Sequence, residues 1–157
     1  MAEWIAWLAP AAALLGTAMA AYLGTWVLKQ DPGTEKMQEI SKAVQEGALA
    51  FLLREYRVLI IFAAVVFVVL GFAVNWLTAV AFATGGVLSA AAGFIGMHVA
   101  TRANARTAQA ATTGVAKALN VAFRSGLTMG LTVASFGLGG LSLWVIILIV
   151  TGEDPLA

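Results

Sequence analysis

The sequence predicts an all-α membrane protein with four transmembrane helices, and three observations support this. Of its 157 residues, 61% are hydrophobic and only 11% are charged, with a mean hydropathy of +0.92. A soluble domain carries roughly 25% charged residues. All nine Lys and Arg residues lie in two stretches, within 29–57 and 102–124, and no Asp, Glu, Lys or Arg occurs from Val58 to Thr101. Four apolar runs are long enough to cross a bilayer core about 30 Å thick.

The first apolar run, 4–28, is predicted to be a span rather than a signal peptide. The chain starts MAEW without a basic region, and the run exceeds the 7–15 apolar residues, roughly, of a signal peptide. Aromatic residues near both ends match interfacial belts. Small residues recur every four positions and would line one helix face, although an alanine-rich span can produce this by chance: Ala12, Gly16, Ala20 and Gly24.

A second helix is expected to start after the turn at Asp31-Pro32-Gly33, with Thr34 as its N-cap and Glu35 in its first turn. We predict one amphipathic helix that continues without a break into span two, 58–74. Glu39–Lys42 and Lys42–Glu46 are spaced to form ion pairs. The charged face is interpreted as solvated surface, with a partner-binding or catalytic surface as the alternative. The apolar positions with helical spacing are Met37, Ile40, Val44, Ala48 and Phe51.

The uncharged segment 75–78, Asn-Trp-Leu-Thr, predicts a tight turn into span three, 79–99, so that spans two and three form a hairpin. Gly85, Ser89 and Gly93 give this span a second small-residue face. His98 at its exit is interpreted as an interfacial hydrogen-bonding residue, with a proton relay as the alternative.

Arg102 and Arg106 share a helix face if the helix runs on past the lipid. They are candidates for contact with anionic headgroups, partner carboxylates or phosphate, and headgroup anchoring is the default interpretation. Span four is predicted at 127–150, with Gly126, Gly130 and Ala134 as a third small-residue face.

The distribution of basic residues predicts the topology, because Lys and Arg near span ends resist translocation. Segments 29–57 and 100–126 are expected in the cytoplasm, and the N-terminus, the turn at Asn75 and the C-terminus outside. The chain is therefore predicted to be a multi-pass protein of the cell membrane, with the lipid bilayer as its surroundings. A role in nucleic-acid binding is excluded, because the basic residues flank spans and there is no compact hydrophilic domain.

The sequence alone predicts no catalytic, cofactor-binding or metal-binding residue. No Asp, Glu, Lys or Arg lies within a predicted span, whereas ion pumps need ionisable groups at membrane depth. The two aspartates, Asp31 and Asp154, are assigned to opposite sides, and a magnesium site needs clustered carboxylates. There is no GxxxxGK[ST] loop, one histidine and no cysteine.

Three stretches, in this order, make the chain resemble the N-terminal part of the membrane-bound inorganic pyrophosphatases, which are pyrophosphate-energised cation pumps. The resemblance covers nearly all of 37–150. The stretches are KMQEI with QEGALAFLLREY (36–40 and 45–56), GM with RANARTA (96–97 and 102–108), and ALNVAFRSG (118–126).

This resemblance implies a homodimer whose subunits have sixteen helices in two concentric rings, of which 1–157 would be the first four outer-ring helices. It implies hydrolysis of magnesium-bound pyrophosphate, coupled to export of H⁺ or Na⁺, with Mg²⁺ as cofactor and K⁺ as a further candidate. The family's DxxADLVGKVE-type motif has no match here, since the sequence stops at Ala157. We therefore expect a fragment that is inactive alone. Its small-residue faces would pack on the inner ring, and Arg102 and Arg106 would brace the cytoplasmic ends. The alternative is a free-standing four-span scaffold or assembly subunit without enzymatic activity.

Overall fold

The computed structural model describes residues 3–151, which form four helices: α1 (Glu3–Leu28), α2 (Glu35–Ala73), α3 (Trp76–Ala111) and α4 (Val115–Thr151). All four are long and apolar enough to cross a membrane, and each predicted span lies in a different helix. The all-α fold with four spanning-length helices is thus confirmed. The side chain of Trp4 and residues 152–157, including Asp154, lie outside the description.

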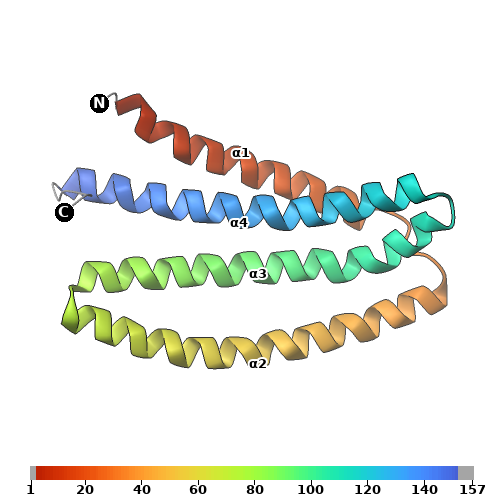
Figure 1. Cartoon of the computed structure of the whole chain (residues 1–157), viewed down its shortest axis with the longest axis horizontal. Coiled ribbons are helices and arrows are strands. Elements are labelled where there is room, and N and C mark those ends of the chain that lie inside the picture. Colours follow the sequence, from red (N-terminus) through yellow and green to blue (C-terminus); the bar gives the residue numbers. More distant parts are fainter. Residues whose placement is uncertain (1–2, 152–157) are drawn as a thin grey trace.

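The four helices lie side by side in an open row, in the order α1, α4, α3, α2 (Figure 1). Across residues 3–151, α2 contacts α3 alone, whereas α1 contacts α4 and, to a smaller extent, α3. The start of α1, the end of α4 and the α2–α3 turn lie at the same end of the helix bundle. The α1–α2 and α3–α4 connections lie at its opposite end, here called the basic end. The two basic stretches therefore lie together, as the charge pattern predicts; which side of the membrane they occupy stays a prediction.

Helix α2 is continuous over 39 residues, as predicted. Thr34 caps it: the Thr34 side-chain oxygen accepts a hydrogen bond from the Met37 backbone N–H at 3.3 Å. At about 1.5 Å per residue the helix is about 58 Å long, so nearly half of it extends beyond a bilayer core of about 30 Å. Because the predicted span is 58–74, the extension would be the stretch 35–57, which lies at the basic end (Figure 1).

The predicted ion pairs of α2 are wrong. The one ion pair that the structure shows within 3–151 joins Lys36 Nζ to Glu39 Oε2 at 2.8 Å. Glu39 thus pairs with a lysine three residues before it rather than with Lys42. Both side chains are exposed, so this pair adds little stability.

Three of the five apolar side chains predicted to line one face at the start of α2 do not face α3. Ile40, Val44 and Phe51 are 55%, 43% and 60% exposed, whereas Ser41 and Leu52, one position further along, are buried. The contact stripe of α2 therefore lies beside its apolar stripe.

The turn between α2 and α3 is shorter than predicted. Asn75 is the N-cap of α3, and its side-chain oxygen accepts a hydrogen bond from the Thr78 N–H at 2.7 Å. Since an Asn N-cap lets the helix begin at the next residue, Trp76 already lies in α3. Val74 and Asn75 alone connect the two helices.

The α3–α4 connection comprises 112–114 only, where Gly114 has a positive φ of 143°. Most of segment 100–126 is thus helical. Arg102 and Arg106 lie on the continuing α3, as expected if the helix runs past the lipid.

The small-residue face of α1 packs against α4. Ala20 is buried, and a methyl group at Gly16 would overlap the Ser135 hydroxyl. At Gly24 it would lie 3.2 Å from Thr128 Cγ2. Ala12, however, is exposed, and Ala13 takes its place in the contact. The expectation that this face packs on helices of an inner ring is therefore wrong for α1, because α4 covers it.

Helix α4 meets its neighbours mainly with hydroxyl side chains, together with Gly139 and Gly140 near its end. Of the six buried residues of α4, all but Val121 carry a hydroxyl: Ser125, Thr128, Thr132, Ser135 and Ser142. Thr128 and Thr132 donate to the carbonyls four residues earlier, both at 2.8 Å, so these buried hydroxyls are paired. Gly126, Gly130 and Ala134 are exposed, and nothing lies within 4 Å of an added Cβ at either glycine. That face is uncovered in the described part of the chain.

Candidate functional site

Polar cross-helix contacts concentrate at the basic end, and Arg106 makes the most direct one. Its Nε and Nη2 donate to the Leu28 carbonyl at 3.2 and 2.9 Å, and its Nη1 donates to the Arg102 carbonyl at 2.8 Å. Leu28 is the last residue of α1, where helix carbonyls lack partners and the helix dipole is negative. Arg106 therefore caps α1 from α3.

The charge of Arg106 persists in this position. Partial burial, and secondarily the neighbouring charge of Arg102, lower the pKa of Arg106 from its usual value. An arginine nevertheless stays protonated at neutral pH, because the pKa of a guanidinium lies far above neutrality. The cap is thus a charged one.

Side-chain hydrogen bonds hold the α1–α2 connection against α3. Gln109 Nε2 donates to Asp31 Oδ2 at 3.1 Å, and the Gly33 N–H donates to Asp31 Oδ1 at 2.9 Å. From the start of α2, Gln38 Nε2 donates to the Gly33 carbonyl at 2.8 Å. These bonds fix the short connection beside the end of α3.

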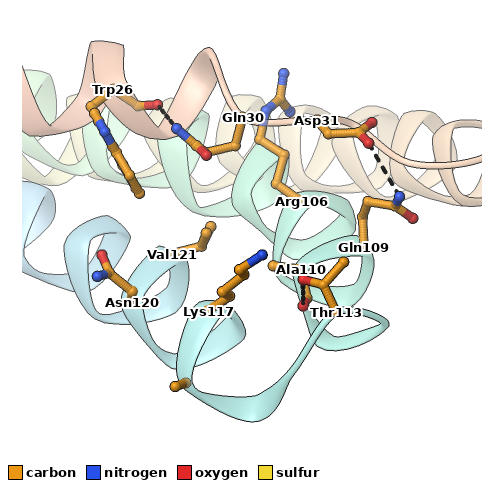
Figure 2. Close-up of a pocket in the computed structure, with 11 residues that line it drawn as sticks. Trp26, Gln30, Asp31, Arg106, Gln109, Ala110, Thr113, Lys117, Asn120 and Val121 are labelled. Atoms are coloured by element: carbon orange, nitrogen blue, oxygen red, sulfur yellow. Dashed lines mark hydrogen bonds between the residues drawn. The ribbon is translucent and has the colours of Figure 1, made fainter.

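A pocket of about 460 Å³ opens between the end of α1, the end of α3 and the start of α4 (Figure 2). Lys117 extends into its centre in Figure 2. The Arg124 guanidinium carbon lies 3.9 Å from the centroid of the Trp26 ring, a cation–π contact. The lining residues are Trp26, Gln30, Asp31, Arg106, Gln109, Ala110, Thr113, Ala116, Lys117, Asn120 and Val121.

The residues singled out from the sequence are only partly brought together. Arg106 braces α1, but Arg102 donates to the His98 carbonyl of its own helix at 3.2 Å. The bracing role predicted for both arginines is therefore seen for Arg106, and the hydrogen bond of Arg102 stays within α3. His98 itself is exposed on α3.

Three contacts of the basic end could not be predicted from the sequence: Arg106 with Leu28, Gln109 with Asp31, and Arg124 with Trp26. In each pair both residues lie close to the same predicted membrane surface, which is the one signal that the sequence offers. Many other residue pairs lie near that surface, so the sequence could not single out the pairs that form these contacts.

A magnesium–pyrophosphate site needs clustered carboxylates around the metal ions. Between residues 3 and 151, no three His, Cys, Asp or Glu side chains come close enough to hold a metal ion. These residues do not fit Mg²⁺ by themselves, and no catalytic step follows from their geometry.

Comparison with known proteins assigns the family. Residues 14–155 match the family model described as inorganic H⁺ pyrophosphatase. A "K(+)-insensitive pyrophosphate-energized proton pump" from Pyrobaculum aerophilum is 46% identical over 130 residues, covering 78% of this chain and 18% of that protein. A protein of the same description from Methanosarcina mazei is 40% identical, covering 85% of this chain and 20% of that protein.

A "K(+)-stimulated pyrophosphate-energized sodium pump" from Thermotoga maritima is 44% identical, covering 74% of this chain and 16% of that protein. The chain thus spans a fifth or less of the length of each of these three relatives. The resemblance noted from the three motifs is confirmed, and four helices of spanning length agree with a multi-pass membrane protein. This chain belongs to the inorganic H⁺ pyrophosphatase family of membrane-bound pumps.

Proposed function

We propose that this chain is the N-terminal part of a pump that hydrolyses magnesium-bound pyrophosphate to two phosphates and exports H⁺ or Na⁺. The observation that carries the proposal is the family match over residues 14–155. The three motifs also support it, as does the position of the two basic connections at the same end of the helix bundle.

Mg²⁺ is the proposed cofactor, with K⁺ as a further candidate, and both would be bound by residues other than those described. Hydrolysis and transport are assigned to those other parts of a homodimeric protein. The part played by this chain is mechanical: its own residues hold helix ends and helix faces in place.

The open row supports a role as one wall of a larger helix assembly. A row of helices has two broad faces, and in α2 Ile60, Ile61 and Phe62 remain 68%, 64% and 61% exposed. We propose that lipid covers one face and further helices of the same protein cover the other. These would be the first four helices of the outer ring, with the N-terminus outside and the basic end in the cytoplasm.

The choice of ion is proposed to be made elsewhere in the protein. A proton-pump relative and a sodium-pump relative match this region almost equally well, at 46% and 44% identity. A region shared so evenly between the two classes does not distinguish them.

The test compares two chains in membranes: the complete gene product with everything encoded after Ala157, and the 157 residues alone. Pyrophosphate hydrolysis is measured, together with acidification and ²²Na⁺ uptake of inverted vesicles. We expect pyrophosphate-dependent transport by the longer chain alone. A reading frame that ends at Ala157, with inert membranes, would instead support a free-standing scaffold.

The scaffold role has its own test at Gly130, on the uncovered face of α4. In the complete protein, Gly130→Leu should lower assembly or thermal stability before it alters the affinity for pyrophosphate. Gly130→Ala, which adds one methyl group, should have a smaller effect in the same direction. A loss of substrate affinity with normal folding would count against scaffolding.

A further inference from the structure

The pocket of Figure 2 is a notch created by unequal helix lengths. Helix α1 ends at Leu28, whereas α3 continues to Ala111 and α4 begins at Val115. Val115 precedes the predicted start of span four by twelve residues, so α4 rises about 18 Å above that level. The notch thus lies where span one meets the interface, and the α3–α4 hairpin overhangs it.

The notch has an excess of positive charge. Arg106 and Lys117 line it, and Arg124 lies over the Trp26 ring that forms part of its wall. Asp31 supplies the carboxylate of the lining, and both of its oxygens already accept hydrogen bonds, from Gln109 and Gly33. The negative end of α1 is offset by Arg106 at Leu28. An anion would therefore be attracted, and Lys117 points into the space that it would fill (Figure 2).

The same notch also has an apolar side that continues towards the lipid. Trp26, Ala110 and Val121 line it. Tyr22 precedes Trp26 by one helical turn, is 59% exposed, and therefore extends the aromatic face towards the membrane core. Tyr and Trp favour the headgroup level of a bilayer because they combine an apolar ring with a polar group. A free phosphate ion would use only the charged side of this notch.

We propose that the notch binds the phosphate of an anionic phospholipid, with Lys117 and Arg124 as its charged partners. The acyl chains would run along Trp26 and Tyr22. Basic pockets between spanning helices are a recurrent way of holding anionic headgroups. The headgroup contact expected of Arg102 and Arg106 is thereby moved to residues on α4, since Arg106 is engaged by Leu28 and Arg102 by its own helix.

The test uses the complete gene product in phosphatidylcholine nanodiscs that contain a small fraction of phosphatidylglycerol with a photoreactive group near its headgroup. After illumination, labelled peptides are located by mass spectrometry. We expect labelling to concentrate on the end of α1 and on the segment from Thr113 to Phe123. Labelling spread evenly over all helices near the interface would overturn the proposal.

Substitutions sharpen the test. Lys117→Gln and Arg124→Gln should each lower notch labelling about fivefold, the effect expected for one basic residue beside an anionic surface. Arg57→Gln is the matched control, because Arg57 is exposed at the same predicted interface on α2 and does not line the notch. Equal loss in the Arg57 variant would contradict a specific site.

Competition identifies the source of the phosphate. Unlabelled phosphatidylglycerol should displace the probe, whereas inorganic phosphate and pyrophosphate at the same concentration should not. Displacement by the inorganic ions would assign the notch to a soluble phosphate and overturn the lipid proposal. This readout needs only the wild-type protein, so it decides the question even if a variant fails to fold.

Discussion

Helices α1 and α2 are the two outermost helices of the row but are held in different ways. In the most apolar 18-residue stretch of α1, 28% of the residues are buried within the chain, against 6% in the corresponding stretch of α2. α1 approaches α4 through glycine, alanine and hydroxyl residues, without a large side chain between Gly16 and Ser135 or between Gly24 and Thr128. Within residues 3–151, α2 touches α3 alone and leaves most of its Val, Ile and Phe side chains exposed.

The difference shows what holds helices together when lipid is the solvent. Lipid tails are as apolar as Val or Leu, so burying those side chains gives little drive for association. Close backbone approach and polar contacts supply it instead. α1 has both, in its small-residue face and its Arg106 cap, whereas α2 has mainly one long hairpin contact. Substitutions should therefore be more damaging on the α1 side than on the α2 side.

The largest effect is expected for Gly16→Leu. Even the first carbon of the new side chain would overlap the Ser135 hydroxyl, so α1 and α4 must separate. Overpacking of this kind costs about 3 kcal/mol. This loss of stability is measured by unfolding the complete protein in a titration with dodecyl sulfate. Ala18→Leu on the exposed side of α1 is the control, and equal stability of the two variants would refute the close-contact argument.

The next largest effect is expected for Arg106→Gln, which removes a charged cap from the Leu28 carbonyl. Hydrogen bonds to charged groups contribute about 2 kcal/mol. Hydrogen exchange should accelerate at amides in the last turn of α1 and in the connection to α2. Arg102→Gln removes an equal charge whose bond stays within α3, so it should leave those amides protected. Similar exchange in both variants would contradict the brace.

On the α2 side, Tyr56→Phe should have a smaller effect. The Tyr56 hydroxyl donates to the Ala90 carbonyl, the side-chain hydrogen bond that joins α2 to α3. Its loss should lower stability by about 1 kcal/mol, since the ring remains in place. The same dodecyl sulfate titration measures it, with Tyr22→Phe as the control because Tyr22 is 59% exposed. A larger loss than that of Gly16→Leu would reverse the ranking of the two sides.

The smallest effect is a gain. Gly47 lies inside α2, and nothing lies within 4 Å of an added Cβ. Gly47→Ala should therefore stabilise the helix by about 0.5–1 kcal/mol, because alanine loses less backbone freedom than glycine. Slower hydrogen exchange around Gly47 would register the gain. Ala50→Gly should do the opposite, and a destabilising Gly47→Ala would reveal a neighbour that covers this position.

Local features of the fold could be predicted from the sequence, because their causes are local. Thr34 as a cap and the uninterrupted α2 follow from residues within a few positions of one another. The uncharged run from Val58 to Thr101, with its polar break at 75–78, predicts the hairpin of spans two and three. The sequence predicts Asn75 in a turn, whereas the structure shows it as a helix cap, and both roles use the same side chain.

The choice of contact face could not be predicted in the same way. α4 carries two small-residue stripes one position apart, Gly126 with Gly130 and Ser125 with Thr128, and spacing alone does not say which one meets α1. The shift from Ala12 to Ala13 has the same origin. The basic end depended on pairs 78 residues apart, Arg106 with Leu28 and Gln109 with Asp31, which only the fold brings together.

The order of helices in the row has a consequence for the synthesis of the protein. α2 can pair with α3 as soon as both are made, because two residues connect them. α1 must wait for α4, since Gly24 meets Thr128, which is translated about 100 residues later. At roughly 5–20 residues per second this delay lasts about 5–20 s, and the small-residue face of α1 remains unpaired in the membrane throughout. Of these four helices, α1 therefore waits longest for the partner of its small-residue face.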